Sequence, residues 1–246
     1  MREIILYLTL LYSGDYQAIK TNIEKENFDI EWNLFEEWSN LFKNKYITFL
    51  DKKYPESLKI SDRSPFTFFY YGNIDIINKF KLLKSNNQDK TILDTLNLKK
   101  LILFLEKDSN SAIVLEQDIN DSKYLRNNKQ INKIIVIYKY DKKLFDSVDN
   151  KTLLVSLFPI IEDENFSKAI NTTKTKNLNE TLLFKLCDAF LVLNSNNFNN
   201  KKESFKAINE LNKNNKQTYY LNQFFSKNKE AKKNISNMEE IYKWEN

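Results

Sequence analysis

The sequence of 246 residues contains no histidine, one cysteine and two glycines. Without histidine, the chain lacks the usual general base, the usual metal ligand and every serine–histidine or cysteine–histidine pair. A single cysteine excludes an internal disulfide and a cysteine-rich zinc site. Any chemistry would have to use carboxylates, lysines or tyrosines. We therefore predict that the chain holds no metal.

The one cysteine, Cys187, lies in the apolar run 186–190, which predicts a buried structural thiol rather than a nucleophile. Long apolar runs are also missing, because no stretch approaches 18 consecutive apolar residues. The apolar start Ile4–Leu6 is interrupted at once and no small-residue cleavage site follows it. We expect a cytoplasmic protein with no membrane segment.

Charge is unevenly distributed along the chain. The net charge is +5, and residues 201–233 hold nine lysines against three glutamates. A basic segment of this kind is compatible with contacts to nucleic acid phosphates, and equally with a solvated helix face.

Apolar spacing divides the chain into two regions. Residues 3–50 show helical spacing with two aromatic-rich patches, at 30–35 and 38–42, which predict two or three short helices. Beyond residue 80, short apolar runs alternate with helical patterns, which favours a parallel sheet covered on both faces. Strands are predicted at 46–50, 66–71, 81–84, 112–115, 134–138, 153–157, 190–193 and 218–221, and helices at 91–106, 142–147, 180–186, 203–212 and 237–244.

Three motifs between residues 46 and 78 carry a family resemblance. They are Tyr54-Pro55-Glu56-Ser57-Leu58, Asp62-Arg63-Ser64-Pro65 and Phe69-Tyr70-Tyr71-Gly72-Asn73. Their order and spacing resemble the Y-P-x-x-L, D-x-x-P and F-x-x-G-N elements of the DprA/Smf family. A looser resemblance continues through Val155–Pro159, Leu186–Val192 and Lys216–Leu221.

The resemblance implies an α/β fold, with a Rossmann-like parallel sheet flanked by helices and preceded by a small helical N-terminal domain. The implied organisation is a helical domain at 1–45, an entry segment at 46–80, a Rossmann-like domain at 81–228 and a C-terminal helix at 229–246. It also implies that the protein is not an enzyme and needs no cofactor, that it binds single-stranded DNA non-specifically and assists a RecA-type recombinase during DNA uptake, and that it is a possible homodimer.

Several family elements are replaced in this sequence. A glycine-serine-arginine turn is replaced by Lys84-Ser85-Asn86, an S-G-x-A element by Glu116-Gln117-Asp118, and an R-N-R triplet by Asn179-Glu180-Thr181. Cradling a phosphate needs converging backbone N–H groups, often at glycines. With only Gly14 and Gly72 in the chain, no such loop can be assigned.

The candidate DNA contacts are therefore residues at loop and helix starts rather than a glycine loop. Lys84 and Ser85 end the first parallel strand, where open sheets bind ligands, although a solvated loop also explains them. The remaining candidates are Lys168, Lys174, Lys176, Lys201, Lys202, Ser204 and Lys206. Bases could stack on Tyr138, Tyr140, Phe158 or Phe166, but most of these aromatic residues are predicted to be core.

Two other hypotheses stay open. The missing glycines and arginines favour a family relic that keeps the fold as an interaction protein without DNA binding. An enzyme acting on a nucleotide or sugar phosphate is disfavoured, because Asn222-Gln223 stands where related folds carry a P-G-G-x-G-T element.

Overall fold

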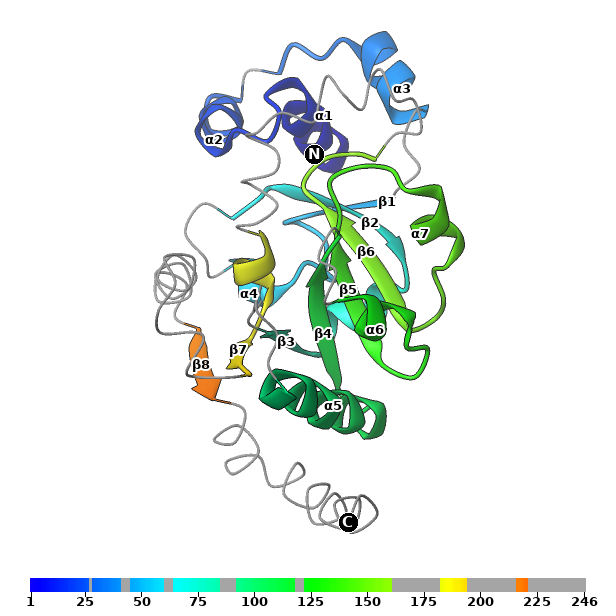
Figure 1. The fold of residues 1–246 in the computed structure, drawn as a ribbon. Coiled ribbons are helices and arrows are strands. Elements are labelled where there is room, and N and C mark those ends of the chain that lie inside the picture. Colours follow the sequence, from blue (N-terminus) through cyan, green and yellow to red (C-terminus); the bar gives the residue numbers. More distant parts are fainter. Residues whose placement is uncertain are drawn as a thin grey trace, which may run out of the picture.

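The structure is a computed structural model. It describes residues 1–26, 28–40, 45–59, 64–84, 92–117, 122–160, 182–193 and 216–220. These residues form one eight-stranded, mostly parallel sheet with helices on both faces and further helices at the N-terminus (Figure 1). The predicted α/β class is confirmed.

Three helices form the N-terminal region: α1 (Arg2–Leu11), α2 (Tyr16–Glu24) and α3 (Trp32–Asn40). The turn after α1 contains Gly14, whose φ of +72° suits glycine and whose N–H donates to the Thr9 carbonyl at 2.9 Å. Asp15 then caps α2 by accepting from the Ala18 N–H at 3.0 Å. The region has a small core, in which Tyr7 packs against the Trp38 ring.

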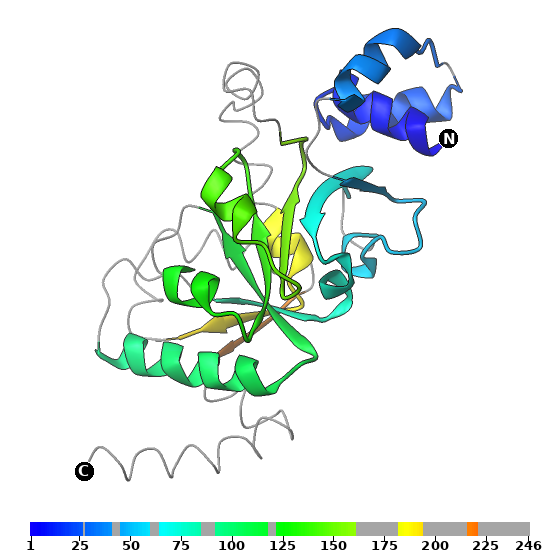
Figure 2. The ribbon, with the colours of Figure 1, turned by 90° about the vertical axis from the view of Figure 1, so that its right-hand side faces the viewer.

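Strands β1 (Lys45–Thr48) and β2 (Thr67–Gly72) pair antiparallel and connect the N-terminal helices to the sheet. Strand β1 ends where the Asp51 carboxylate accepts hydrogen bonds from the backbone N–H and the hydroxyl of Thr48, at 2.7 and 3.0 Å. Arg2 fixes α1 to this hairpin, because its guanidinium lies over the Tyr46 ring and 3.2 Å from the Asp51 carboxylate. Figure 2 shows α1–α3 gathered beside β1 and β2, at the opposite end of the molecule from α5.

The parallel part of the sheet contains β3 (Phe80–Lys84), β4 (Ser111–Glu116), β5 (Asn132–Val136), β6 (Thr152–Ser156), β7 (Ala189–Val192) and β8 (Gln217–Tyr220). The strand order is β1-β2-β6-β5-β4-β3-β7-β8, and β2 joins β6 antiparallel. From β3 the chain therefore builds the sheet outward on one side as far as β6, and then crosses to the other side for β7 and β8.

Both faces of the central strands are buried, which explains their continuous apolar runs. One face packs on α5 (Ile92–Lys107), α6 (Ser122–Asn127) and α7 (Lys142–Asp146). The other packs on α4 (Glu56–Lys59), the 3₁₀ helix η1 (Ile74–Asn78) and a helical turn at 182–186. Within β4, Ala112 and Val114 face the second group, whereas Ile113 and Leu115 face the first.

The family-like motifs prove to be structural parts of this arrangement. Buried Tyr54 donates a hydrogen bond to the Pro65 carbonyl, and burial raises the pKa of its phenol. Gly72 has a φ of +99°, and a Cβ there would lie 2.4 Å from the Thr152 carbonyl oxygen. Asn73 ties β2 to β6 by donating from its backbone to that carbonyl at 3.1 Å and from its side chain to the Asn150 carbonyl at 2.8 Å.

All eight predicted strands are present, with ends that shift by one or two residues. Helices predicted at 91–106, 142–147 and 180–186 are also found, and the two aromatic patches at 30–42 belong to the single helix α3 as far as it is described. Short elements α4, η1 and α6 were not predicted. The helices predicted at 203–212 and 237–244 lie outside the described residues.

No helix in the described ranges combines the length and the apolar character that crossing a membrane would require.

Candidate nucleic-acid interface

The carboxyl ends of the parallel strands meet at one edge of the sheet, which we call the carboxyl edge. Strands β3 and β7 are neighbours there, and the order of the chain reverses between them, so this is the topological switch point at which open α/β sheets bind ligands. Lys84 of β3 pairs in register with Leu191 of β7 at this place. A ligand site is therefore expected along this edge.

Lys84 is buried, with 4% of its surface exposed, and it is part of β3, so the solvated-loop interpretation does not describe it. The N-terminal half of α5 covers the switch point, since buried Asn97 donates from its side chain to the Leu193 carbonyl at 2.5 Å. The other predicted contacts lie outside the described residues: Ser85, Lys168, Lys174, Lys176, Lys201, Lys202, Ser204 and Lys206.

Gln117 occupies the position after β4 where the resemblance would place a glycine-rich element. Its side chain is buried, and its amide donates to the Lys139 carbonyl at 3.0 Å. The amide oxygen accepts from the backbone N–H groups of Tyr138 at 3.0 Å and Lys139 at 3.3 Å. One side chain thus satisfies the backbone at the end of β5, where converging N–H groups would otherwise be open to a phosphate.

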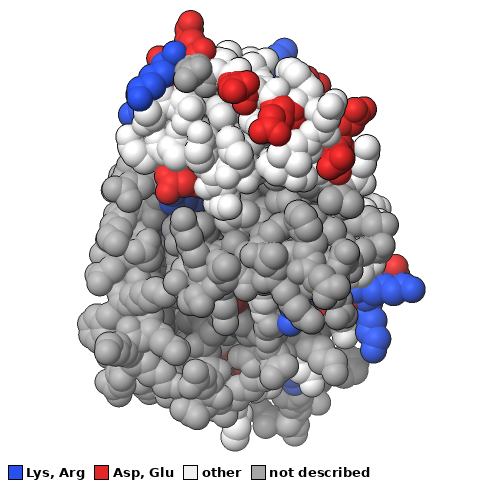
Figure 3. Space-filling view, turned by 90° about the horizontal axis from the view of Figure 1, so that it is seen from above, with Lys and Arg blue, Asp and Glu red and all other residues white. Residues whose placement is uncertain are grey.

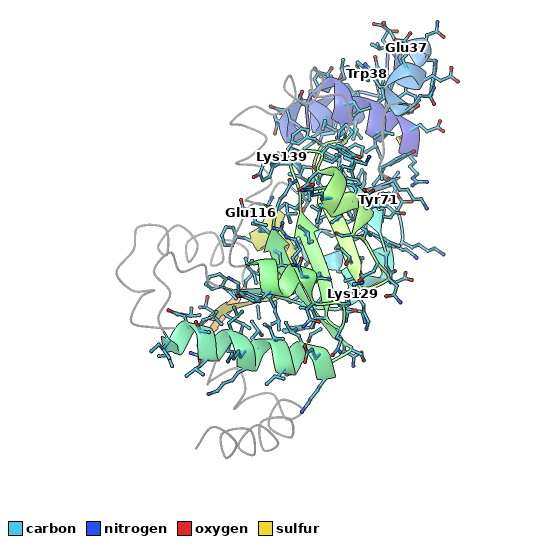
Figure 4. All side chains as sticks on the ribbon, turned by 45° about the vertical axis from the view of Figure 1, so that its right-hand side comes forward. Glu37, Trp38, Tyr71, Glu116, Lys129 and Lys139 are labelled. Carbon is cyan, nitrogen blue, oxygen red and sulfur yellow. The ribbon has the colours of Figure 1, made fainter. Side chains whose placement is uncertain are left out.

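The segment after β5 forms a basic and aromatic strip on the carboxyl edge. We define the edge strip as Tyr138, Lys139, Lys142 and Lys143. Lys139, Lys142 and Lys143 are exposed, Tyr138 is half-buried, and the Lys139 ammonium lies 5.6 Å from the centre of the Tyr138 ring. Figure 4 shows Lys139 and Lys129 toward opposite ends of the strands.

The start of α7 is held by a cap, and an exposed ring lies on α6. Asp141 caps α7 by accepting from the Leu144 N–H at 3.2 Å, which fixes the helix start that carries Lys142 and Lys143. Tyr124, which is 74% exposed, lies on α6, the helix that follows β4. Exposed rings beside lysines are the combination that sequence-indifferent binding of single strands uses, because every base offers a flat face.

The sequence analysis named Tyr138 and Tyr140 but missed the lysines between and after them. Phe158 is buried, so the prediction of a core position is confirmed for it, whereas Tyr140 packs on Phe145 with ring centres 5.1 Å apart and is half-buried. Phe166 lies outside the described residues. The alternation of tyrosine and lysine directly after a buried strand was the signal that could have identified the strip.

Three buried polar groups that resemble catalytic candidates have structural partners. Cys187 is buried as predicted, and burial is the main cause that raises the pKa of its thiol to about 12. The Lys133 ammonium donates to the carbonyls of Arg126 and Asn128, at 3.0 and 2.8 Å, and burial lowers its pKa. Lys81 pairs with Asp188 at 2.9 Å. No cluster of acidic and cysteine side chains among the described residues is able to hold a metal ion.

Comparison with known proteins reveals similarity at the level of structure. No protein-family model matches the chain, and no curated protein matches it in sequence. A crystal structure of DNA processing protein A (DprA) from Streptococcus pneumoniae aligns with a TM-score of 0.60 and 16% identity, covering 89% of this chain and 81% of that one.

A structure of DNA processing protein A from Helicobacter pylori, described as showing a single-stranded DNA binding mode, aligns with a TM-score of 0.53 and 14% identity. That alignment covers 72% of this chain and 81% of the other. The class that the fold defines is thus an α/β protein with a mostly parallel sheet and N-terminal helices. More specifically, the chain has a distant DprA-like fold.

Proposed function

We propose that this protein binds single-stranded DNA without sequence preference along the carboxyl edge of its sheet. The observation that carries the proposal is the edge strip, which places three exposed lysines and the Tyr138 ring on the ligand-binding edge of a DprA-like fold. Lysines hold phosphates through charge, and the rings hold bases through stacking. Neither contact reads the sequence.

The proposal extends to the lysines outside the described residues and to partners. Lys168, Lys174, Lys176, Lys201, Lys202 and Lys206, with Ser85 and Ser204, would add phosphate contacts, whereas buried Lys84 would add positive potential from within the sheet. In this role the protein would act in the cytoplasm, without catalysis, and would assist a RecA-type recombinase, alone or as a homodimer.

The test is the affinity for a labelled oligothymidylate at several salt concentrations. The variant Lys139→Gln/Lys142→Gln/Lys143→Gln removes three positive charges from the carboxyl edge. We expect it to bind at least about tenfold more weakly, and the salt dependence of log K to fall by about two, since each lost contact with a single strand contributes about 0.7.

A matched control removes the same charge from the opposite, amino edge. Lys107 ends α5, Lys129 follows α6 and Lys151 precedes β6, and the Gln triple variant at these positions should bind nearly as the parent does. If both triple variants lose DNA affinity equally, the carboxyl edge is not the binding site. Absence of binding at low salt would reject DNA binding altogether.

The second candidate is an interaction protein that keeps the fold without binding DNA. Gln117 favours it, because its amide already satisfies the N–H groups of Tyr138 and Lys139. If the parent protein shows no affinity for DNA at low salt while it remains folded, this candidate is the one to pursue.

A further inference from the structure

A cavity of about 460 Å³ lies between the N-terminal helices and the end of β6. Its walls come from three places: the start of α2, the entry into β2, and the segment after β6 with the helical turn at 182–186. Its volume falls within the range of about 300–1,000 Å³ that is typical of small-molecule sites. The end of β6 also belongs to the carboxyl edge, so the cavity and the edge strip share one side of the sheet.

Three aromatic rings, those of Tyr16, Phe66 and Phe158, form part of the apolar wall of the cavity, beside aliphatic side chains such as Leu157 and Leu182. Tyr16 and Phe66 stack with ring centres 5.1 Å apart and planes 19° apart. Phe158 forms another wall and closes against Gly14, where an added Cβ would lie 3.6 Å from its ring. The stacked rings present a flat surface on which a planar ligand can lie.

The polar groups of the cavity suit a neutral ligand with several hydrogen-bonding atoms. Asp15 and Lys185 carry opposite charges, so neither an anion nor a cation is strongly favoured. The hydroxyls of Thr9 and Thr67 are hydrogen-bonded at 3.1 Å in the buried part of this interface. Gln17 is exposed and offers an amide, whose adjacent donor and acceptor match the edge of a base.

We propose that this cavity binds one nucleobase, stacked on the Tyr16–Phe66 pair and hydrogen-bonded by Gln17. A nucleobase is planar, largely neutral and bordered by donors and acceptors, as these walls require. If the base belongs to a bound strand, this proposal rests on the proposed function, because the strand on the carboxyl edge would turn one of its bases into the cavity. A free nucleoside offers the same chemistry, and the experiment separates the two sources.

The experiment follows the fluorescence of 2-aminopurine, which rises when the base leaves its stack in a strand and is quenched on an aromatic ring. One probe is an oligothymidylate with a single internal 2-aminopurine, and the other is the free 2-aminopurine nucleoside. The parent protein should change the fluorescence of the strand at saturation. Tyr16→Leu should abolish most of that change and weaken strand binding about tenfold, as expected for the loss of one stacked base.

Two further variants make the result specific. Gln17→Ala, at an exposed position, should lower the affinity for the nucleoside or for the strand severalfold without affecting the fold. Tyr71→Leu removes a ring of the same kind from β2, where it packs on Phe145 outside the cavity, and should leave both signals unchanged (Figure 4). An equal effect of Tyr71→Leu would overturn the proposal.

The outcomes distinguish the two proposals. If the strand binds but Tyr16→Leu and Gln17→Ala behave as the parent, the cavity proposal fails and the proposed function stands. If the strand does not bind while the free nucleoside binds and loses affinity in Tyr16→Leu, the cavity holds a free base and the proposed function fails. If neither probe binds, both fail.

Discussion

The N-terminal helices and the sheet differ in charge and in packing. Residues 1–40 contain three basic and eight acidic residues, a net charge of −5, which leaves +10 for the remainder of the chain. Figure 3, which looks down on the N-terminal helices, shows acidic side chains gathered over them. Under the proposed function, DNA would be repelled there and attracted to the sheet.

The N-terminal helices also have a smaller buried core than the sheet. Among the described residues, the N-terminal helices bury five apolar side chains, those of Ile5, Leu6, Tyr7, Leu8 and Ile19, whereas each face of the sheet packs a much larger buried cluster. We infer that the sheet holds most of the stability and that the helices open first. Four predictions test this comparison, from the largest expected effect to the smallest.

Gly72→Ala should be the most destabilising change. The added Cβ would lie 2.4 Å from the backbone oxygen of Thr152, at a φ of +99°, so β2 and β6 must separate or shift. We expect a loss of more than about 4 kcal/mol in the free energy of unfolding, measured with urea. Gly14→Ala in the helices meets only an ordinary contact and should cost about 1–2 kcal/mol. Equal losses would contradict the comparison.

Asp188→Ala should be the next largest. It leaves Lys81, which is 7% exposed, without its carboxylate partner inside the sheet. A loss of about 2–3 kcal/mol is expected, because an uncompensated charge remains buried. The corresponding pair in the helices, Lys20–Glu24, is largely exposed at 3.6 Å, so Glu24→Gln should leave the urea midpoint unchanged.

Trp38→Ala should affect the helices alone. It removes the ring that stacks on Tyr7 with centres 6.1 Å apart, at an expected cost of about 1–2 kcal/mol. Hydrogen exchange should show faster exchange in α1–α3 and unchanged protection in β4–β6. Faster exchange in β5 as well would mean that the two regions unfold as one unit.

The smallest effect concerns pH and the sheet core. Burial keeps Cys187 a thiol up to a pKa of about 12, whereas the unfolded chain ionises near its ordinary value of 9.0. The stabilising effect is therefore complete below pH 9 and is lost as the pH rises toward 12. The free energy of unfolding of the parent minus that of Cys187→Ala should therefore be about 1.4 kcal/mol smaller at pH 10 than at pH 7. A flat difference between pH 7 and pH 10.5 would show that the thiol is accessible in the native protein.

The fold could be predicted from the sequence to a large extent because its strands are buried on both faces. Their apolar runs are continuous and clearly bounded, and the alternation with helical patterns indicates parallel pairing. Helix α6 and the 3₁₀ helix η1 were not predicted, because five or six residues are too few to display the hydrophobic period of a helix. The strand order depends on contacts far apart in the sequence, such as β2 with β6, and no local pattern encodes it.

The candidate site could be predicted less well. Lys84 was correctly placed at the carboxyl edge, but its burial depends on the cover that α5 provides, which a local pattern does not encode. Tyr138 and Tyr140 flank Lys139 alike in the sequence, yet the Lys139 ammonium lies over the ring of Tyr138 alone in the described contacts, whereas Tyr140 packs on Phe145. The Tyr16–Phe66 wall joins residues 50 positions apart, so it could only be found in the structure.

The pairing of β2 with β6 has a consequence for how the chain is made. Phe69 lies opposite Ser156, so the hairpin that opens the sheet has no neighbour until more than 80 further residues have been synthesised. Strands β3 to β6 pair with their successors in the sequence and can assemble as they emerge from the ribosome. The first strands of the polypeptide therefore join the sheet after its middle, and until then the aromatic face of β2 is exposed to chaperones and to other nascent chains.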